Sequence, residues 1–310
     1  MKNLAFIAVL LLIGMTRACA DAPITALAIA PDGKHVVLGS QVGIEIRSLP
    51  DLTITGKLST ELEHVHDLKF SRDGQTLLAA GGSPAESGRV EVWIWPKSER
   101  IREVGDHDDV VYRVAWSPDG TQWVTCSGDG RCLVFSLATG EQVAIYEGHS
   151  RGVLAGGFLD DRTITTAGID QTIRVWNCVD GLHQRTLDNH VGAINDIAVR
   201  PASANQAGDV IATISEDRTV RLWQPRIGRL MRFGRLASVP RSLGWSSDAT
   251  KIYVGCNDGR VRIIDTESME IEAEIDGLVG RIHELVVHST EGYIVTAGEK
   301  GCRVVSVRAK

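Results

Sequence analysis

Three sets of a histidine, a threonine and an aspartate recur along the middle of the chain. The sets are His107, Thr125 and Asp129; His149, Thr166 and Asp170; and His190, Thr213 and Asp217. A hydroxyl, an imidazole and a carboxylate in contact could activate a nucleophile, with the imidazole accepting the proton of the hydroxyl. Three equivalent copies argue against that chemistry, because an active site needs one set and an architectural role needs one in every repeat. We therefore predict that these residues are structural and that none is catalytic.

The spacing of the sets indicates the kind of repeat. His149 lies 42 residues after His107 and 41 residues before His190, a period typical of one four-stranded propeller blade. An aromatic residue follows each aspartate at the same distance, and these residues are Phe135, Trp176 and Trp223. Runs with apolar residues at alternate positions, such as 172–176 and 260–264, predict the strands of each blade.

A turn motif follows the first strand of several blades. Residues 116–120, Trp-Ser-Pro-Asp-Gly, return in related form at 29–33, 70–74 and 245–249, and Pro, Asp and Gly favour tight turns. The complete frame has seven blades, at about 24–58, 65–104, 110–146, 152–187, 193–233, 239–275 and 281–310. We predict an all-β fold, a seven-bladed β-propeller of four-stranded antiparallel blades, in one domain spanning 21–310.

The first twenty residues have the features of a secretory signal peptide. Lys2 precedes an apolar run over 4–13, and the small residues Ala18 and Ala20 flank Cys19 at an expected cleavage site. The run is too short to span a bilayer comfortably. We therefore expect cleavage after Ala20, no membrane span, and a secreted or periplasmic protein. Two alternatives remain, namely retention of the segment as a strand or buried helix, and lipidation of Cys19.

The charge balance disfavours nucleic acid as a partner. Loss of Lys2 and Arg17 with the signal peptide lowers the 33 basic residues to 31, against 39 acidic residues, so the mature chain carries a net charge of −8. An acidic surface repels phosphate backbones.

Cysteine and histidine patterns predict neither a disulfide framework nor a metal. Five scattered cysteines remain after cleavage, without a C-x-x-C pair, and we interpret them as small buried hydrophobic residues. The densest group of metal-ligand types is Glu61, Glu63, His64, His66 and Asp67. We interpret this group as a solvated loop that enters the second blade, and we expect no metal and no cofactor.

These motifs resemble the WD-repeat (tryptophan-aspartate repeat) seven-bladed β-propeller family over nearly all of 22–310. The resemblance implies that His, Thr, Asp and Trp form a hydrogen-bonded tetrad, complete in the fourth blade with Trp176 and in the fifth with Trp223. The third blade has Phe135, which cannot donate an indole N–H, and the sixth retains only Asp258. The chain contains no Trp-Asp dipeptide.

The resemblance also implies a binding face. In this family, the loops that enter each first strand and join the second strand to the third surround the mouth of a central channel. One residue per blade is expected there: Thr25, His66, Tyr112, Leu154, Asn195, Arg241 and His283. Two insertions stand out, residues 82–88 on that face and residues 202–208 on the opposite face.

We therefore predict a secreted scaffold that binds a protein partner and is not an enzyme. The alternative is a propeller enzyme or redox-associated protein that holds a metal or a quinone in its central channel. Featureless metal analysis and absorption spectra of the mature protein would favour the scaffold.

The closure of the ring poses a separate question. Such propellers usually complete their last blade with an N-terminal strand, but cleavage after Ala20 leaves three residues before the first blade. We expect a three-stranded last blade whose outer edge, 302–307, offers unpaired backbone groups and is protected against aggregation by Arg303, Arg308 and Lys310. A partner or a second copy is expected to add a strand there. Alternatively, the residues before position 20 are retained and cover this edge.

Overall fold

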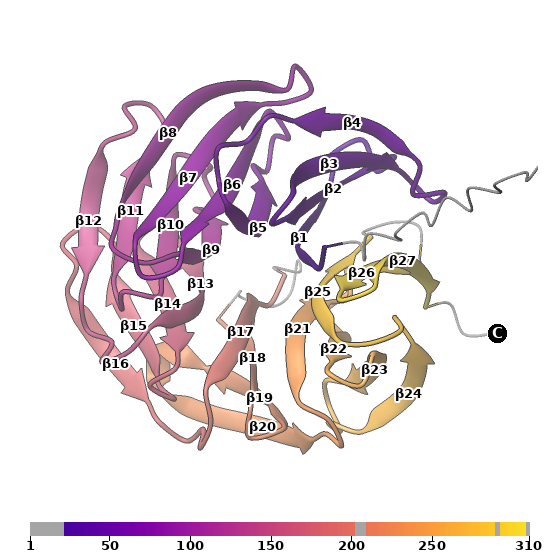
Figure 1. Ribbon diagram of the computed structural model, residues 1–310. Coiled ribbons are helices and arrows are strands. Elements are labelled where there is room, and N and C mark those ends of the chain that lie inside the picture. The colour runs from indigo at the N-terminus through magenta and orange to yellow at the C-terminus, as the bar shows by residue number, and fades with distance from the viewer. Residues whose placement is uncertain (1–21, 202–208, 289–291, 308–310) are drawn as a thin grey trace, which may run out of the picture.

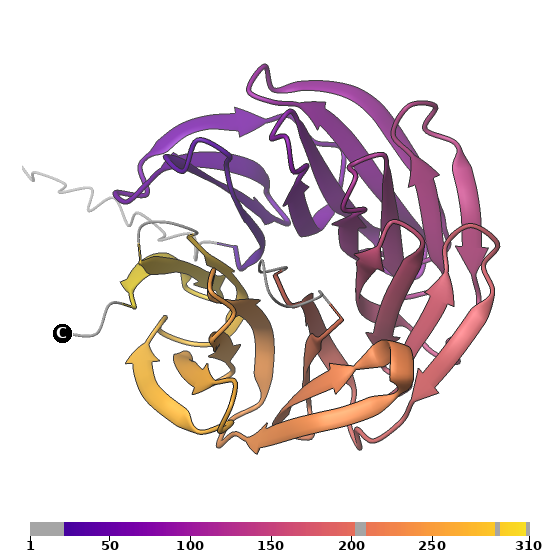
Figure 2. The ribbon, with the colours of Figure 1, turned by 180° about the vertical axis from the view of Figure 1, so that it is seen from behind.

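Residues 22–201, 209–288 and 292–307, which this computed structural model describes, form seven antiparallel sheets arranged in a ring (Figure 1). The sheets follow one another around the ring in chain order, as the same ring viewed from behind also shows (Figure 2). The seven-bladed fold expected from the sequence is confirmed. The expected signal peptide, 1–20, and the insertion 202–208 lie outside the described residues.

The first strand of each blade lies next to the central channel, and neighbouring first strands contact one another around the whole ring. These first strands are β1 (Ile24–Ile29), β5 (His64–Phe70), β9 (Val111–Trp116), β13 (Val153–Asp160), β17 (Ile194–Val199), β21 (Pro240–Trp245) and β25 (Ile282–Val287). The second strands are β2 (His35–Ser40), β6 (Thr76–Ser83), β10 (Gln122–Ser127), β14 (Thr163–Gly168), β18 (Ile211–Ser215), β22 (Lys251–Cys256) and β26 (Tyr293–Gly298).

The third and fourth strands lie toward the rim. The third strands are β3 (Gly43–Ser48), β7 (Ser87–Ile94), β11 (Cys132–Ser136), β15 (Ile173–Asn177), β19 (Thr219–Gln224), β23 (Arg260–Asp265) and β27 (Gly301–Ser306). The fourth strands are β4 (Ile54–Leu58), β8 (Glu99–His107), β12 (Gln142–Tyr146), β16 (His183–Leu187), β20 (Arg229–Arg235) and β24 (Ile271–Asp276).

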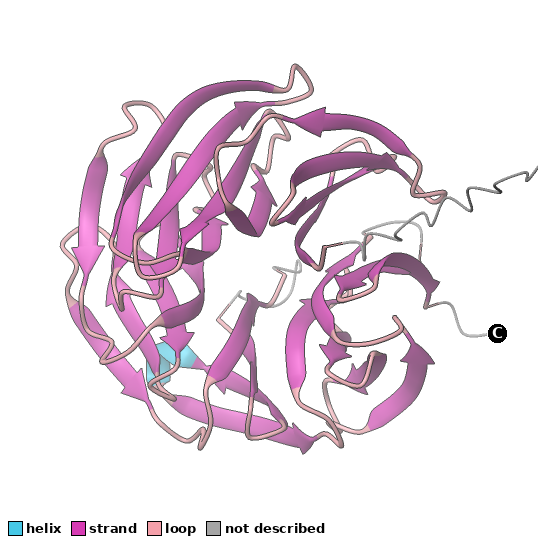
Figure 3. Ribbon diagram, viewed as in Figure 1, coloured by secondary structure: helices cyan, strands magenta, loops and turns pink. Residues whose placement is uncertain are grey.

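Strands dominate the molecule (Figure 3). The helix that the described part of the chain contains is η1 (Pro225–Ile227), a single 3-10 turn. None of the helical structure described is therefore of the length and apolar character needed to traverse a bilayer.

The hydrophobic core consists of layers between neighbouring blades. One layer joins blades four and five, where Ile173 and Leu187 pack in one cluster with Ile211 and Trp223. Side chains of the second strands are buried on both faces, as in β18, whereas in the outer strand β16 only Leu187 is buried. Because each fully buried Leu or Ile contributes about 1.5–3 kcal/mol, these layers hold adjacent blades together.

The Pro-Asp-Gly motif after the first strand of blade three forms the tight turn that the sequence predicts. In blade three the carboxylate of Asp119 accepts hydrogen bonds from Ser117 Oγ at 2.6 Å and from Thr121 N at 3.0 Å. Gly120 follows with φ of 71°, a left-handed conformation that favours glycine. The motif therefore closes the turn from β9 to β10 by local polar contacts.

The last blade has three strands among the described residues, in the order β25–β26–β27. The expected three-stranded blade is thus confirmed for this part of the chain. Arg303 donates to the carbonyl oxygen of Asp276 in blade six at 3.2 Å, so its guanidinium reaches toward the neighbouring blade.

Candidate functional site

The histidine, threonine and aspartate of each central blade form one connected network. In blade five, His190 Nδ1 lies 2.8 Å from Asp217 Oδ2, and His190 Nε2 lies 2.8 Å from Thr213 Oγ1. Trp223 Nε1 donates to the same threonine hydroxyl at 2.9 Å. The network links the loop before the blade, the turn after its second strand and the buried indole on its third strand. It is a satisfied polar network of the kind that fixes local geometry.

Blade four repeats the arrangement. His149 lies 2.9 Å from both Asp170 Oδ2 and Thr166 Oγ1, and Trp176 Nε1 donates to Thr166 at 3.3 Å. Burial opposes ionisation of Asp170, but hydrogen bonds from His149 and the backbone of Thr172 hold the pKa of this carboxyl well below its usual value. The aspartate is therefore ionised at neutral pH.

Blade three keeps the histidine, threonine and aspartate of the network but has a phenylalanine in place of the tryptophan. His107 lies 2.8 Å from Asp129 Oδ2 and 2.7 Å from Thr125 Oγ1. Phe135, which replaces the tryptophan, stacks on Trp123 with ring centres 5.7 Å apart. The threonine hydroxyl instead accepts a hydrogen bond from the backbone of Leu133 at 3.3 Å.

Blades two and six instead use ion pairs in which one partner is buried, Glu91 in blade two and Arg262 in blade six, and sequence reasoning missed both pairs. In blade two, fully buried Glu91 accepts from Arg100 Nη1 at 2.7 Å, Trp93 Nε1 at 3.2 Å and the hydroxyl of Thr60 at 2.8 Å. In blade six, Arg262 pairs with Asp258 at 2.7 Å. A charged residue at an inward position of an alternating strand was the available signal for both.

The seven residues expected at the channel mouth line one pocket of about 260 Å³. These residues are Thr25, His66, Tyr112, Leu154, Asn195, Arg241 and His283, and Arg113 and Glu284 complete the lining. Equivalent positions on seven first strands converge because the strands are arranged around one axis. We call the seven residues from equivalent positions the mouth ring, and the surface on which their pocket opens the mouth face.

Contacts within the mouth ring hold several of its side chains in place. Tyr112 meets His66 edge-on with ring centres 5.2 Å apart. Asn195 Nδ2 donates to the carbonyl oxygen of Pro240 at 2.8 Å, and Arg241 Nε donates to Asn257 Oδ1 at 2.9 Å. These contacts reduce the conformational freedom that a binding partner would otherwise have to restrict.

The two histidines of the mouth ring are neutral at neutral pH. Burial, together with the nearby His64 imidazole, lowers the pKa of His66 to about 4. Burial also lowers the pKa of His283. The ring therefore presents imidazoles that can accept hydrogen bonds, one phenol and one guanidinium.

A buried charge cluster lies next to the mouth ring in the channel. Arg113 Nη2 donates to Asp196 at 2.6 Å, and Arg113 Nη1 lies 3.5 Å from both Asp67 and Glu284. We call these four residues the hub. A further cavity of about 450 Å³, lined in part by Phe70, also borders Arg113 and Glu284.

The hub also connects adjacent blades through the backbone. Asp67 in blade two accepts from Val114 N in blade three at 2.9 Å, and Asp196 in blade five accepts from Leu243 N in blade six at 3.1 Å. Burial raises the pKa of Glu284 to about 6, although Arg113 opposes that change. The hub was not foreseen from the sequence.

The acidic and histidine-rich segment 61–67 differs from the solvated loop that we expected. Asp67 is fully buried on β5 as part of the hub, and His66 belongs to the mouth ring. Glu61 is exposed and pairs with Arg100 at 2.5 Å. Within the described ranges, no three or more His, Cys, Asp or Glu side chains are grouped so that they could hold a metal ion.

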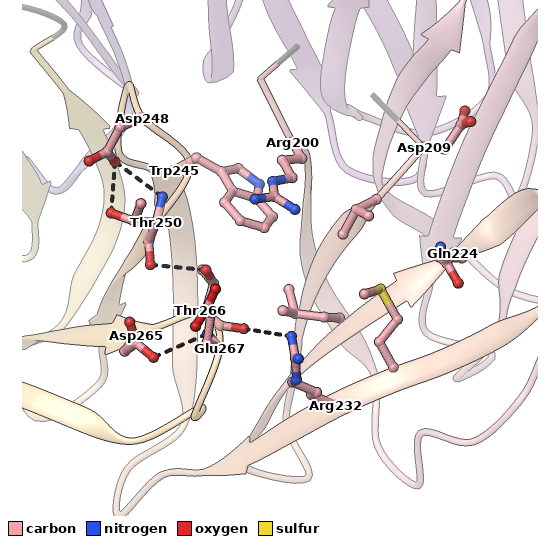
Figure 4. A pocket seen from close by; sticks show the side chains of 13 residues that line it. Arg200, Asp209, Gln224, Arg232, Trp245, Asp248, Thr250, Asp265, Thr266 and Glu267 are labelled. Atoms are coloured by element: carbon pink, nitrogen blue, oxygen red, sulfur yellow. Dashed lines mark hydrogen bonds between the residues drawn. The ribbon is translucent and has the colours of Figure 1, made fainter. Parts of the chain in front are cut away.

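A separate cavity lies between blades five and six, away from the mouth ring (Figure 4). It has a volume of about 690 Å³, and the Arg200 guanidinium sits 5.8 Å from the ring centre of Trp245 in its wall. Arg232 donates to the carbonyl oxygen of Thr266 at 3.3 Å, and Asp248 is held by its own turn. None of the residues predicted for partner binding lines this cavity.

Comparison with known proteins places the repeats in a family context. The family described as "WD domain, G-beta repeat" matches residues 98–136, 140–177, 181–224 and 233–265. Three of the four matches begin just before the outer strand of one blade, the fourth begins within β20, and each continues into the next blade. The matched stretches contain β8 and β9–β11, for example, and so join blades two and three.

Several curated proteins are similar at low identity. Protein ROOT INITIATION DEFECTIVE 3 of Arabidopsis thaliana is 26% identical over 205 residues, which cover 61% of this chain and 46% of that protein. Actin-interacting protein 1 of Drosophila melanogaster is 26% identical over 51% of this chain and 32% of its own length. The guanine nucleotide-binding protein subunit beta of Nicotiana tabacum is 26% identical over 57% of this chain and 50% of its own length. The chain spans half or less of each of these relatives.

Proposed function

Because the chain belongs to the WD-repeat family of β-propellers, we propose that it is a protein-interaction scaffold without catalytic activity of its own. The names of two relatives support this proposal, since one is an actin-interacting protein and the other a subunit of a guanine nucleotide-binding protein. The three-fold repetition of the His–Thr–Asp sets supports a structural role for them. Metal analysis and an absorption spectrum of the purified protein test the alternative of a metal or quinone enzyme.

The observation that carries the proposal is the mouth ring. Tyr112 and Arg241 line the same pocket, and tyrosine and arginine are enriched among the residues that dominate binding energy at protein interfaces. A pocket of about 260 Å³ fits one or two side chains and not a folded domain. A partner would therefore insert a protruding side chain or loop tip while resting on the surrounding face.

A rigid hairpin adds to the mouth face beside this pocket. The β6–β7 hairpin of blade two extends to the pair Ser83 and Ser87. Its tip is tied to blade three, since Ala85 N donates to Asp109 Oδ1 at 2.9 Å. The insertion expected over 82–88 thus forms a braced projection, which supplies contact area outside the pocket.

A second contact is proposed at the outer edge of blade seven. Among the residues described, β27 pairs with β26 alone, so its outward backbone groups are available to an added strand from a partner or a second copy. We further propose that the protein is exported, on the basis of the basic start, apolar run and small residues in 1–20.

The mouth ring is tested by partner capture with matched variants. Tagged full-length protein, its Tyr112→Ala/Arg241→Ala variant and an Arg229→Ala control are used to capture partners from the native host, followed by mass spectrometry. Arg229 is exposed on the outer strand β20, so its loss leaves capture unchanged. The double variant is expected to lose the partner while keeping the wild-type melting temperature. Equal capture by all three proteins would show that the partner does not bind at the mouth ring.

A further inference from the structure

Two cysteines face each other across neighbouring strands of blade three. Cys126 on β10 is paired directly with Cys132 on β11. Ser127 N donates to Arg131 O at 3.2 Å, so the adjacent pair, Cys126 and Cys132, occupies a non-hydrogen-bonded site of the antiparallel ladder. The Cα atoms of such pairs are about 4.5 Å apart, and disulfides form when Cα atoms are about 4.4–6.8 Å apart.

Both side chains point to the same side of the sheet. They belong to one apolar cluster with Val153 and Trp176 of blade four, and both are 0% exposed. Gly156 of blade four provides room for Cys126, because a Cβ atom added to this glycine would lie 2.6 Å from Cys126 Sγ. The two sulfur atoms therefore share one enclosed space between blades three and four.

The folded protein protects these thiols from reaction. Burial raises the pKa of the Cys132 thiol well above its ordinary value, and its hydrogen bond with Cys126 adds to that effect. Because the thiolate is the reactive species, chemistry at this pair belongs to the folding chain, before blade four covers blade three.

The thiol pair is specific to blade three among the blades with a matching register. The equivalent pairs are Ala167 with Ile173, Ile214 with Val220, Gly255 with Val261, and Ala297 with Cys302. Each of these pairs consists of small or β-branched residues, except that the pair in blade seven contains one cysteine, Cys302. The space between blades at this position can therefore be filled without two cysteines, so packing does not by itself explain the pair.

We propose that Cys126 and Cys132 form a cross-strand disulfide when the chain folds in an oxidising compartment. The oxidant is a disulfide, either glutathione disulfide or the disulfide of a thiol–disulfide oxidoreductase. One cysteine thiolate attacks it, forms a mixed disulfide and releases one thiol; the second thiolate then attacks the sulfur of the first cysteine and releases the other thiol. The two cysteines lose two protons and two electrons, and the oxidant accepts both electrons.

The bond would brace the turn that carries Asp129. The turn 128–131 joins the two cysteine-bearing strands, and Asp129 is the network residue that His107 contacts. Blade three is also the central blade whose network has Phe135 in place of an indole donor. A covalent link at the base of this turn would compensate for that missing hydrogen bond. In the structure Cys126 and Cys132 are buried free thiols, as expected from the sequence, and the proposed bond would give this pair a covalent role in addition to packing.

The disulfide is tested by peptide mapping of the full-length chain. The chain is folded from denaturant in a glutathione redox buffer or with excess reductant, its free thiols are alkylated in denaturant, and trypsin is added. Cleavage after Arg113, Arg131 and Arg151 places Cys126 on peptide 114–131 and Cys132 on peptide 132–151. We expect these two peptides to be linked in the oxidised sample and separate after reduction. Alkylation of both cysteines to the same extent as Cys256 in the oxidised sample would overturn the proposal.

Two variants complete the test. Cys126→Ala reproduces the alanine that blade four has at this position, Ala167, and should fold without the linked peptides. Cys256→Ala removes a buried thiol of blade six and should retain them. Reductant is expected to lower the melting temperature of the wild type and of Cys256→Ala but not that of Cys126→Ala. An equal response of all three proteins to reductant would also overturn the proposal, without affecting the scaffold function.

Discussion

His190 Nδ1 lies 2.8 Å from Asp217 Oδ2, so the loop that enters blade five is joined to a turn 27 residues further along the chain. The same carboxylate oxygen accepts a hydrogen bond from Val191 N at 3.3 Å, and Thr219 N donates to the other oxygen at 3.0 Å. A single aspartate thus satisfies donors from two separate segments. Its removal would leave buried groups without partners, which is more costly than the loss of an exposed contact.

Replacement of this aspartate or its equivalent should lower stability measurably. We expect Asp217→Ala and Asp170→Ala each to cost about 1–3 kcal/mol of unfolding free energy, since each leaves an imidazole and backbone amides unpaired. Asp188→Ala is the control, because Asp188 is exposed in the loop before His190 and surface changes usually stay within about 0.5 kcal/mol. Urea unfolding measures all three, and three equal midpoints would mean that the network does not support the fold.

Loss of Arg113 should be more severe than loss of one tetrad aspartate. Arg113→Met removes the counter-charge that buried Asp196 and Glu284 share with Asp67, which keeps Lys69 at 3.3 Å. Removal of one partner of a buried ion pair typically costs about 3–5 kcal/mol. Adding Glu284→Gln to Arg113→Met should recover part of that loss, because it removes one uncompensated carboxylate. Denaturant unfolding measures the free energies, which should fall from the wild type through the double variant to Arg113→Met. A double variant less stable than Arg113→Met would contradict the proposed charge balance.

The buried imidazole of His66 should make the fold sensitive to acid. Its pKa is lowered to about 4, whereas a histidine in an unfolded chain has a pKa of about 6.5. Between these values the unfolded chain binds a proton that the folded chain does not, so stability present above pH 6.5 is lost as the pH falls toward 4. His66→Gln should lose less stability than the wild type over this range. The free energy of unfolding of both proteins is measured from pH 7 to pH 4. An equal loss in the wild type and in His66→Gln would show that folding does not lower the pKa of His66.

Backbone exchange should distinguish an open from a covered edge on blade seven. The amide protons of β27 that face away from β26 are expected to exchange rapidly in the monomer, whereas those of β19, which lies between β18 and β20, exchange slowly. Hydrogen–deuterium exchange of the purified protein measures both strands in one experiment. Slow exchange throughout 304–307 without added ligand would mean that another segment already covers this edge.

The periodic features of the sequence were sufficient to predict the ring. The repeated His, Thr and Asp positions set the blade length, and the alternation of apolar residues located the strands. Asn195 and Tyr112 could be assigned to one pocket because they hold equivalent positions on their first strands. The strands and blades need only local patterns, whereas the assignment of these residues to one face at the channel mouth also rests on the resemblance to the WD-repeat family.

The hub could not be predicted in the same way. Alternation places Arg113 and Asp196 on inward positions, but it does not indicate that blades three and five meet across the channel. In blade two the inward position of Glu91 was a signal of a buried charge, but a search for the repeat does not identify Arg100 as its partner. Both depend on contacts between non-equivalent residues, which depart from the repeat and must be observed in three dimensions.

The hub has a consequence for the number of blades. Its carboxylates come from blades two, five and seven, and all of them reach one guanidinium on blade three. Deletion or duplication of a blade would change the circumference and move these strands relative to Arg113, although every blade could still fold locally. Repeat arrays commonly gain or lose units by duplication, because each unit contacts only its neighbours. In this protein the ion pairs of the hub require the strand spacing of a seven-bladed ring. A ring of six or eight blades would lose these contacts and the stability that they provide.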